Sequence, residues 1–251
     1  MKTLKYLKYI QQYSDHAYAA LRNNFPDRVS FDSLLNSIES DTEKDLFLRL
    51  ASFYRFLVKE GNMHYSNPAW CNGLQYIDDT FKFISIFALI EAACSDVKHM
   101  DFYEFLVRRD THLEYPIQSK QHVDKFYEEY KQKHGSIQKA VRFFELLDEK
   151  CKRNLVNKLK VKLKASESKS AAWSRWEDKS AIELAKLLYD MRSQFVHNAE
   201  FVLTLSKRPV LTLTPKHALL TYLCLEDMMV FFEHGLLLRF GYRGDLNHLL
   251  D

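Results

Sequence analysis

The chain has 251 residues, of which 47% are hydrophobic and 27% are charged, a balance that is ordinary for a globular protein with one large or two small domains. The formal net charge of +3 is too small to identify a partner by itself. Only 6 glycines and 5 prolines are present, so long stretches run without a helix breaker, and 18 Phe with 14 Tyr supply material for a core.

Cysteine and histidine spacing argues against a disulfide framework and against a metal site. The ten histidines show no H-E-x-x-H or other metal-binding spacing, and no glycine-rich phosphate loop is present, so we expect no metal and no cofactor. The cysteines form no C-x-x-C pair, which suits a reduced cytosolic protein. They are Cys71, Cys94, Cys151 and Cys224.

No segment has the pattern of a membrane span or of a signal peptide. Residues 1–11 carry three lysines but no apolar stretch. The most apolar run, 83–94, is too short to cross a bilayer and contains Glu91. We therefore expect a soluble, cytoplasmic protein that does not bind membranes.

Helical periodicity dominates the first third of the chain. Ser30 and Asp41 are the expected N-caps of the second and third helices, and Gly61 suits the C′ position after the third. Asn, Gly and Pro in residues 62–77 predict a loop, which divides an N-terminal helical region of unknown role (1–77) from the remainder (78–251). The predicted helices cover residues 4–25, 30–40, 42–60 and 78–94.

The second region is also predicted to be helical, with one small β-hairpin. The segments 201–205 and 210–213, both rich in Val, Leu and Thr, flank a Ser-Lys-Arg-Pro turn, and together they predict the hairpin. Thr214 as cap and Pro215 at the first position then predict a final helix over 215–239. The fold class is therefore all-α, a helical bundle. Its other predicted helices cover 121–133, 137–148 and 181–197, and 165–179 is expected to be a loop.

The helix 181–197 has a polar face and an apolar face. At 100° per residue, Asp190 and Ser193 lie within about 40° of His197, whereas Leu188 and Phe195 occupy the opposite, core-facing side. Arg192 lies about 140° from His197, within the apolar arc. A charged side chain at that position either pairs with an opposite charge or extends from the edge of the arc into water.

Glu91 is a candidate partner for Arg192. Apart from the thiol of Cys94, it is the only ionisable side chain in the run 83–94, whose apolar residues predict a buried helix. A carboxylate is rarely buried unless it is paired. We predict the ion pair Glu91–Arg192; a Glu91 that reaches water at a rim is the alternative.

The segment Leu188-Tyr-Asp-Met-Arg192-Ser-Gln-Phe-Val-His197 resembles the R-x4–6-H signature of HEPN domains, particularly the ApeA-like branch, in which Tyr-x-x-Arg-Ser leads to Val-His. Phe87-Ala-Leu-Ile-Glu91-Ala also resembles the first core helix of that branch, which carries an acidic residue in a similar setting. The resemblance covers roughly residues 78–240 and implies a HEPN-type bundle. R-x4-H alone is a common pattern, and it is the combination with Tyr189, Val196 and the Glu91 helix that carries the resemblance.

The resemblance implies a metal-independent endoribonuclease that acts as a homodimer in defence or in a toxin-like stress response. His197 would serve as general base or acid and Arg192 as phosphate ligand, with Glu91 orienting Arg192. Tyr189, Ser193 and Asn198 would support them. An antitoxin or another regulatory partner is a further implied possibility.

Two positions depart from the family pattern and keep a second interpretation open. Many active members have Asn, Asp or His after the Arg, where this chain has Ser193, and the branch more often has Gly where Asn198 stands. A non-catalytic helical module that binds RNA, a nucleotide or a protein partner is the alternative function. Without the resemblance, His197 is a solvated histidine near a helix C-terminus, where the helix dipole favours its cation.

A basic run over residues 150–164 is the candidate RNA surface. Seven of its fifteen residues are Lys or Arg and none is acidic, so it either follows a phosphate backbone or forms a solvated face. Trp173 and Trp176 either stack bases or pack against the motif helix. The candidate RNA-binding residues are Lys158, Lys160, Lys162 and Lys164, with Lys207 and Arg208 at the hairpin tip.

Overall fold

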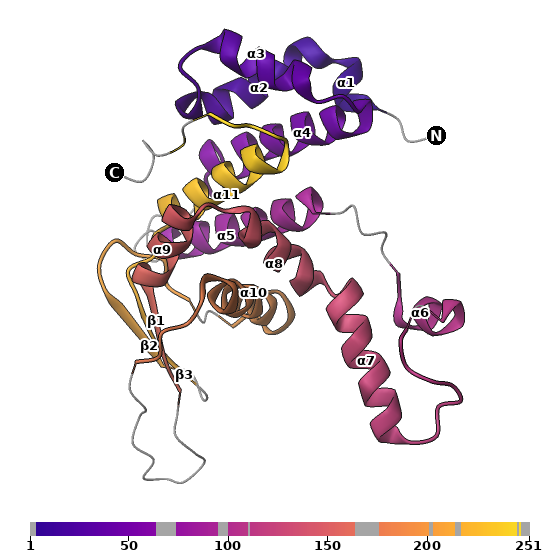
Figure 1. The fold of residues 1–251 in the computed structure, drawn as a ribbon. Helices are drawn as coiled ribbons and strands as arrows, with labels where there is room; N and C mark the ends of the chain where they lie inside the picture. The colour runs from indigo at the N-terminus through magenta and orange to yellow at the C-terminus, as the bar shows by residue number, and fades with distance from the viewer. Residues whose placement is uncertain are drawn as a thin grey trace.

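The structure is a computed structural model, and it describes residues 4–63, 74–94, 100–109, 111–163, 176–200, 203–213, 217–244 and 246. It is mostly helical with one small sheet (Figure 1), as the all-α prediction required. Among the described residues, no helix combines the length and the apolarity needed to cross a bilayer. Lys164, Thr214, Pro215 and Trp173, which figure in the predictions, lie outside the described residues.

The N-terminal helices form a layer over α11 (Leu225–Arg239), at the top of Figure 1. Two predicted caps are displaced: Asp27 rather than Ser30 accepts the backbone N–H at the start of α3, and Ser40 rather than Asp41 does so for α4. Each actual cap has the extended backbone that an N-cap requires. The elements are α1 (Lys5–Lys8), α2 (Ile10–Leu21), η1 (Arg22–Asn24), α3 (Arg28–Ser37), α4 (Asp41–Tyr54) and the π-helix η2 (Arg55–Lys59).

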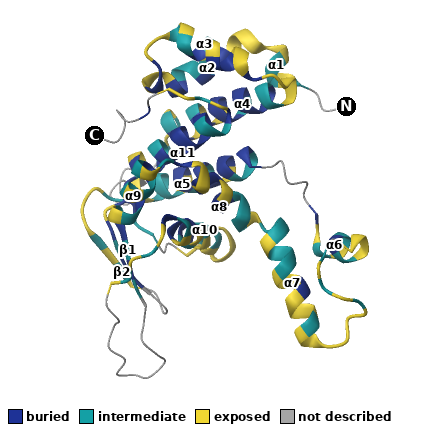
Figure 2. Cartoon of the chain, in the orientation of Figure 1, coloured by how far each residue is buried: buried dark blue, intermediate teal, exposed yellow. Residues whose placement is uncertain are grey.

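Four helices make the centre of the molecule: α5 (Leu74–Ala93), α8 (Ser136–Leu146), α10 (Ala181–Asn198) and α11. Helix α5 begins four residues earlier than predicted, so the predicted boundary at residue 77 falls inside it. One hydrophobic cluster runs from Ala17 to Leu246 and joins both sides of that boundary. In Figure 2 the buried residues follow the inner faces of these helices.

Glu233 on α11 ties the N-terminal layer to this core. It is 4% exposed. Its Oε1 accepts a hydrogen bond from the Tyr54 hydroxyl at 2.6 Å, and its Oε2 accepts one from Asn24 Nδ2 at 2.6 Å. Lys59 Nζ forms an ion pair with Oε1 at 2.8 Å. A buried carboxylate is tolerated when it is paired and hydrogen-bonded in this way.

Helices α6 (Phe102–Arg108) and α7 (Lys120–His134) project from the bundle, as Figure 1 shows. They have a small core of their own, formed by Met100, Phe105 and Phe126. Helix α7 lies within one residue of its predicted bounds at each end, whereas α6, a short helix capped by Asp101, was not predicted. The arm is joined to the bundle where α7 packs on α8.

The sheet differs from the predicted hairpin. It has the order β1-β3-β2 and is antiparallel throughout, with β1 (Leu159–Leu163), β2 (Val210–Leu213) and β3 (His217–Thr221). The partner of 210–213 is therefore β3, and 203–205 is not a strand; its neighbour Ser206 instead donates one backbone bond to Leu223 O.

The predicted start of the final helix at residue 215 is also wrong, because residues 217–221 form the central strand. Both neighbouring strands form backbone hydrogen bonds with this strand. The stabilisation from these bonds outweighs the local preference of the Thr-Pro sequence for a helix start. Helix α11 instead begins at Leu225, where Cys224 and Asp227 form a capping box, and it ends at Arg239 as predicted. Helix α9 (Glu149–Lys158) leads directly into β1.

Candidate functional site

The motif helix α10 is well defined at both ends. Ser180 and Glu183 form a capping box at its start: the Ser180 hydroxyl accepts the Glu183 N–H at 3.2 Å, and the Glu183 carboxylate accepts the Ser180 N–H at 2.9 Å. At the other end Ala199 adopts φ 55°, a left-handed C-cap. Leu184, Leu188 and Met191 are buried, as predicted for the apolar face.

The predicted ion pair between Glu91 and Arg192 is present. Arg192 Nη2 lies 3.1 Å from Glu91 Oε1, and the two side chains are 18% and 21% exposed. Arg192 is thus turned inward toward α5 rather than extended to water. The contact is one of charge proximity rather than of aligned hydrogen bonds, because Glu91 Oε1 and Arg192 Nε have no hydrogen-bond partner in the described part of the chain.

Tyr189 completes a small cluster around this pair. The Arg192 guanidinium carbon lies 5.5 Å from the centre of the Tyr189 ring. Burial and the nearby Glu91 carboxylate raise the pKa of Tyr189, whereas a hydrogen bond with Ser136 on α8 lowers it. The phenol therefore stays protonated and able to donate near neutral pH.

The structure does not bring His197 into this cluster. His197 is exposed at the last turn of α10, as are Asn198 and Val196, and its side chain makes no hydrogen bond or ion pair with the described residues. His197 lies five positions after Arg192, which corresponds to about 7.5 Å along the helix axis and about 140° around it. The two motif residues therefore face different sides of α10.

A broad polar cleft of about 620 Å³ lies on the His197 side of α10. Lys186, Tyr189, Asp190 and Ser193 line one wall, and Lys186, Asp190 and Ser193 belong to the polar stripe that also contains His197. The opposite wall comes from α7 and from the turn into α8: Tyr127, Glu128, Lys131, Gln132, Gly135, Ser136, Ile137 and Gln138. The cleft is large enough for a nucleotide-sized ligand.

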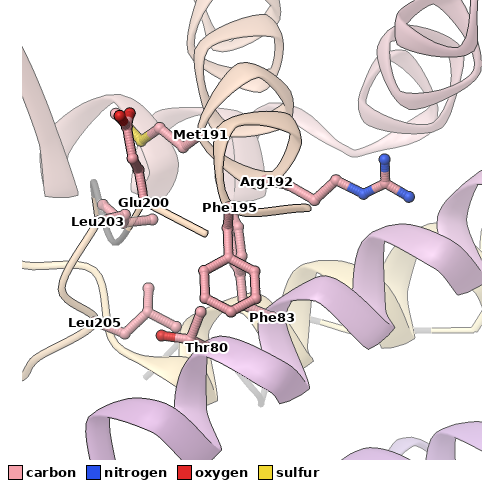
Figure 3. A pocket seen from close by; sticks show the side chains of 8 residues that line it. All are labelled: Thr80, Phe83, Met191, Arg192, Phe195, Glu200, Leu203 and Leu205. Carbon is pink, nitrogen blue, oxygen red and sulfur yellow. The ribbon is translucent and has the colours of Figure 1, made fainter. Parts of the chain in front are cut away.

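Figure 3 shows a second hollow, on the opposite side of α10 between Phe83, Phe195 and Leu205. Its interior space is about 10 Å³, roughly the room of one water. The guanidinium of Arg192 points away from it in Figure 3. This hollow is a packing gap beneath the motif helix and not a place for substrate.

Several of the predicted RNA-binding lysines are engaged within the chain. Lys158 forms a close ion pair with Asp227, and Lys207 forms one with Glu226 at 2.8 Å. Lys160 lies 3.9 Å from Asp178, and Lys162 lies 4.5 Å from the centre of the Trp176 ring. The basic run is also split between α9 and β1, so its charges do not follow one helix face.

Asp148, Cys151 and His234 converge in the structure, although no sequence motif predicts that they meet. Cys151 Sγ lies 3.0 Å from His234 Nδ1, and all three potential ligand atoms lie within 4.8 Å of one another. The only local signal is Asp148-x-x-Cys151 at the start of α9. His234 is 83 residues further on, so no short motif announces the cluster.

No protein-family model, curated protein or solved structure matches the chain. The resemblance to HEPN domains therefore rests on the residues of α5 and α10 alone, and the activity it implies is a proposal.

Proposed function

We propose that the protein is a metal-independent endoribonuclease of HEPN type, acting in defence or in a toxin-like stress response. The observation that carries the proposal is the inward-facing Arg192, paired with Glu91 on a buried helix, five residues before the exposed His197. Core-facing arginines are uncommon, and this one coincides with the family signature.

The residue types suit cleavage of RNA by its own 2′-hydroxyl. The 2′-oxygen attacks the phosphorus, the bond to the 5′-oxygen breaks, and the products are a 2′,3′-cyclic phosphate and a 5′-hydroxyl. His197 is the group that takes or supplies a proton. Arg192 binds the phosphate through the exposed part of its guanidinium, while Glu91 holds the side chain in place.

One histidine per chain cannot readily serve as both base and acid in a single turnover. The proposal therefore includes an isologous homodimer in which the C-terminal ends of two α10 helices meet. His197, Asn198 and Val196 are exposed at that end and are available for such a contact. Substrate bases would lie in the cleft between α7 and α10, beside Tyr127 and Ser193.

The test is cleavage of end-labelled RNA by the purified protein in EDTA, with circular dichroism to confirm that the fold persists. We expect products with 2′,3′-cyclic or 3′-phosphate ends, and a loss of at least about 100-fold in rate for His197→Ala. His112→Ala is the matched control, because His112 is also exposed but lies in the loop before α7. Full activity of a folded, dimeric His197→Ala variant would overturn the mechanism.

The alternative function is a non-catalytic helical module that binds RNA, a nucleotide or a protein. Ser193 after Arg192 favours it, because many active members of the family have Asn, Asp or His at that position. The same assay separates the two functions, since stable binding without cleavage by the parent protein supports the module.

A further inference from the structure

The convergence of Asp148, Cys151 and His234 is independent of the proposed nuclease site. Cys151 and His234 are both fully buried, whereas Asp148, the N-cap of α9, is partly exposed. The cluster is made by α9 and α11, and the nuclease residues lie on α5 and α10. Three metal-ligating side chains of different types thus meet at one point in the core.

The donor set is one that zinc accepts. Zn²⁺ in proteins takes thiolate sulfur at about 2.3 Å, and imidazole nitrogen and carboxylate oxygen at about 2.0–2.2 Å, so ligand atoms in a tetrahedral site stand roughly 3.5 Å apart. The observed spacings, 3.0 Å between Cys151 Sγ and His234 Nδ1 and at most 4.8 Å within the trio, need only small side-chain adjustments to reach that arrangement.

Harder cations fit less well. Ca²⁺ and Mg²⁺ prefer six or more oxygen ligands, and here one carboxylate stands beside a sulfur and a nitrogen. An ion would enter from the side of Asp148, the one ligand of the three that reaches the surface. Three protein ligands leave the fourth tetrahedral position to a water.

We propose that Asp148, Cys151 and His234 form a zinc site that clamps α9 to α11. Binding replaces the thiol proton of Cys151 with a Zn–S bond and releases that proton to solvent. Since β1 follows α9 directly at Leu159, the clamp also fixes the position of the sheet's first strand. Its role is structural, because both Cys151 and His234 are closed to substrate.

The experiment titrates the full-length, chelator-treated protein with Co²⁺ and Zn²⁺. We expect a thiolate-to-cobalt charge-transfer band that saturates at one equivalent and that Zn²⁺ abolishes. At a free Zn²⁺ concentration 100 times the Kd, the unfolding equilibrium constant should fall about 100-fold. Cys151→Ala should lose both effects.

Cys224→Ala is the matched control. Cys224 is also buried and contacts a carboxylate, with its Sγ 3.0 Å from Asp227 Oδ2, but it is not part of a three-ligand group in the described residues. This variant should keep the band and the stabilisation. Absence of the charge-transfer band in the parent protein overturns the proposal, whether or not Cys151→Ala folds. A band of equal strength in folded Cys151→Ala overturns it as well.

Discussion

Glu233 and Glu91 are two carboxylates that lie on central helices of the same bundle, and they are satisfied to different degrees. Glu233 receives hydrogen bonds from Tyr54 and Asn24 and an ion pair from Lys59. Glu91 has Arg192 at 3.1 Å, yet its Oε1 makes no aligned hydrogen bond, and neither does Arg192 Nε. Both carboxylates interact with a cation, but only one has a complete set of partners.

This difference is consistent with a structural role for Glu233 and with the positioning role that the proposed mechanism gives to Glu91. A fully bonded buried carboxylate holds elements together, and it has no capacity left for a ligand. An incompletely bonded pair costs stability and persists more readily where a ligand can complete it. Glu233 therefore attaches the N-terminal helices to the core, and in the proposed mechanism Glu91 positions Arg192.

The largest expected effect is on stability, at Glu233. Glu233→Ala should lower the free energy of unfolding by about 3–5 kcal/mol, because Tyr54, Asn24 and Lys59 lose their shared acceptor within the core. Urea unfolding followed by circular dichroism measures it. Glu60→Ala removes the exposed ion pair with Arg55 and should cost less than about 1 kcal/mol. Equal effects in the two variants would contradict the assignment of Glu233.

The next effect is on activity, at Arg192. If it stabilises the transition state of RNA cleavage, Arg192→Ala should reduce kcat by about 100- to 1,000-fold. Arg192→Lys, which keeps the charge but lacks the planar fork, should recover only part of this loss. The rates come from the labelled-RNA assay under saturating substrate. A folded Arg192→Ala variant with unchanged kcat would remove Arg192 from the mechanism.

A smaller effect is expected at Glu91, which acts through Arg192. Glu91→Gln keeps the shape of the side chain but removes the charge that orients the guanidinium, and we expect roughly tenfold lower kcat, equivalent to about 1.4 kcal/mol. KM should change little. A positioning role also predicts that Glu91→Gln has almost no further effect in an Arg192→Ala background. Additive losses in the double variant would refute that role.

The smallest effect is at the start of the motif helix. Ser180→Ala removes the N-cap of α10 and should lower the free energy of unfolding by about 1 kcal/mol, as measured by urea unfolding. Ser33→Ala is the control, because Ser33 lies in the middle of α3, where its hydroxyl only bonds back to Val29 O. That change should stay within about 0.5 kcal/mol. A similar loss in both variants would show that the cap does not stabilise α10.

Features set by local pattern were predictable from the sequence. The apolar face of α10 and the ends of α7 followed from helical periodicity. The Glu91–Arg192 pair followed from the cost of placing a lone charge on a core-facing surface, an argument that needs no knowledge of the fold. Polar groups in apolar surroundings are thus the most informative residues of this chain.

Features set by distant segments were not predictable in the same way. The central strand β3 exists because β1 and β2 flank it, and no local signal competes with the Thr214-Pro215 pattern before it. The alternation Leu159-Lys-Val-Lys-Leu163 is a strand signal in the sequence, but the same lysines also make the segment part of a basic run that resembles a nucleic-acid surface. The meeting of Cys151 with His234 depends on the packing of α9 against α11 and leaves no trace in spacing.

The projecting arm of α6 and α7 should unfold locally more often than the bundle to which it is attached. Among the described residues, the buried part of its core consists of Met100, Phe105 and Phe126, and it is separate from the larger hydrophobic cluster of the bundle. Cooperative units in proteins follow such divisions, and a small unit opens more often than the body to which it is attached. The arm carries one wall of the polar cleft, including Tyr127, Lys131 and Gln132. Backbone amides of α7 will therefore exchange with deuterated solvent faster than those of α10, and the two walls of the cleft will differ in their rate of opening.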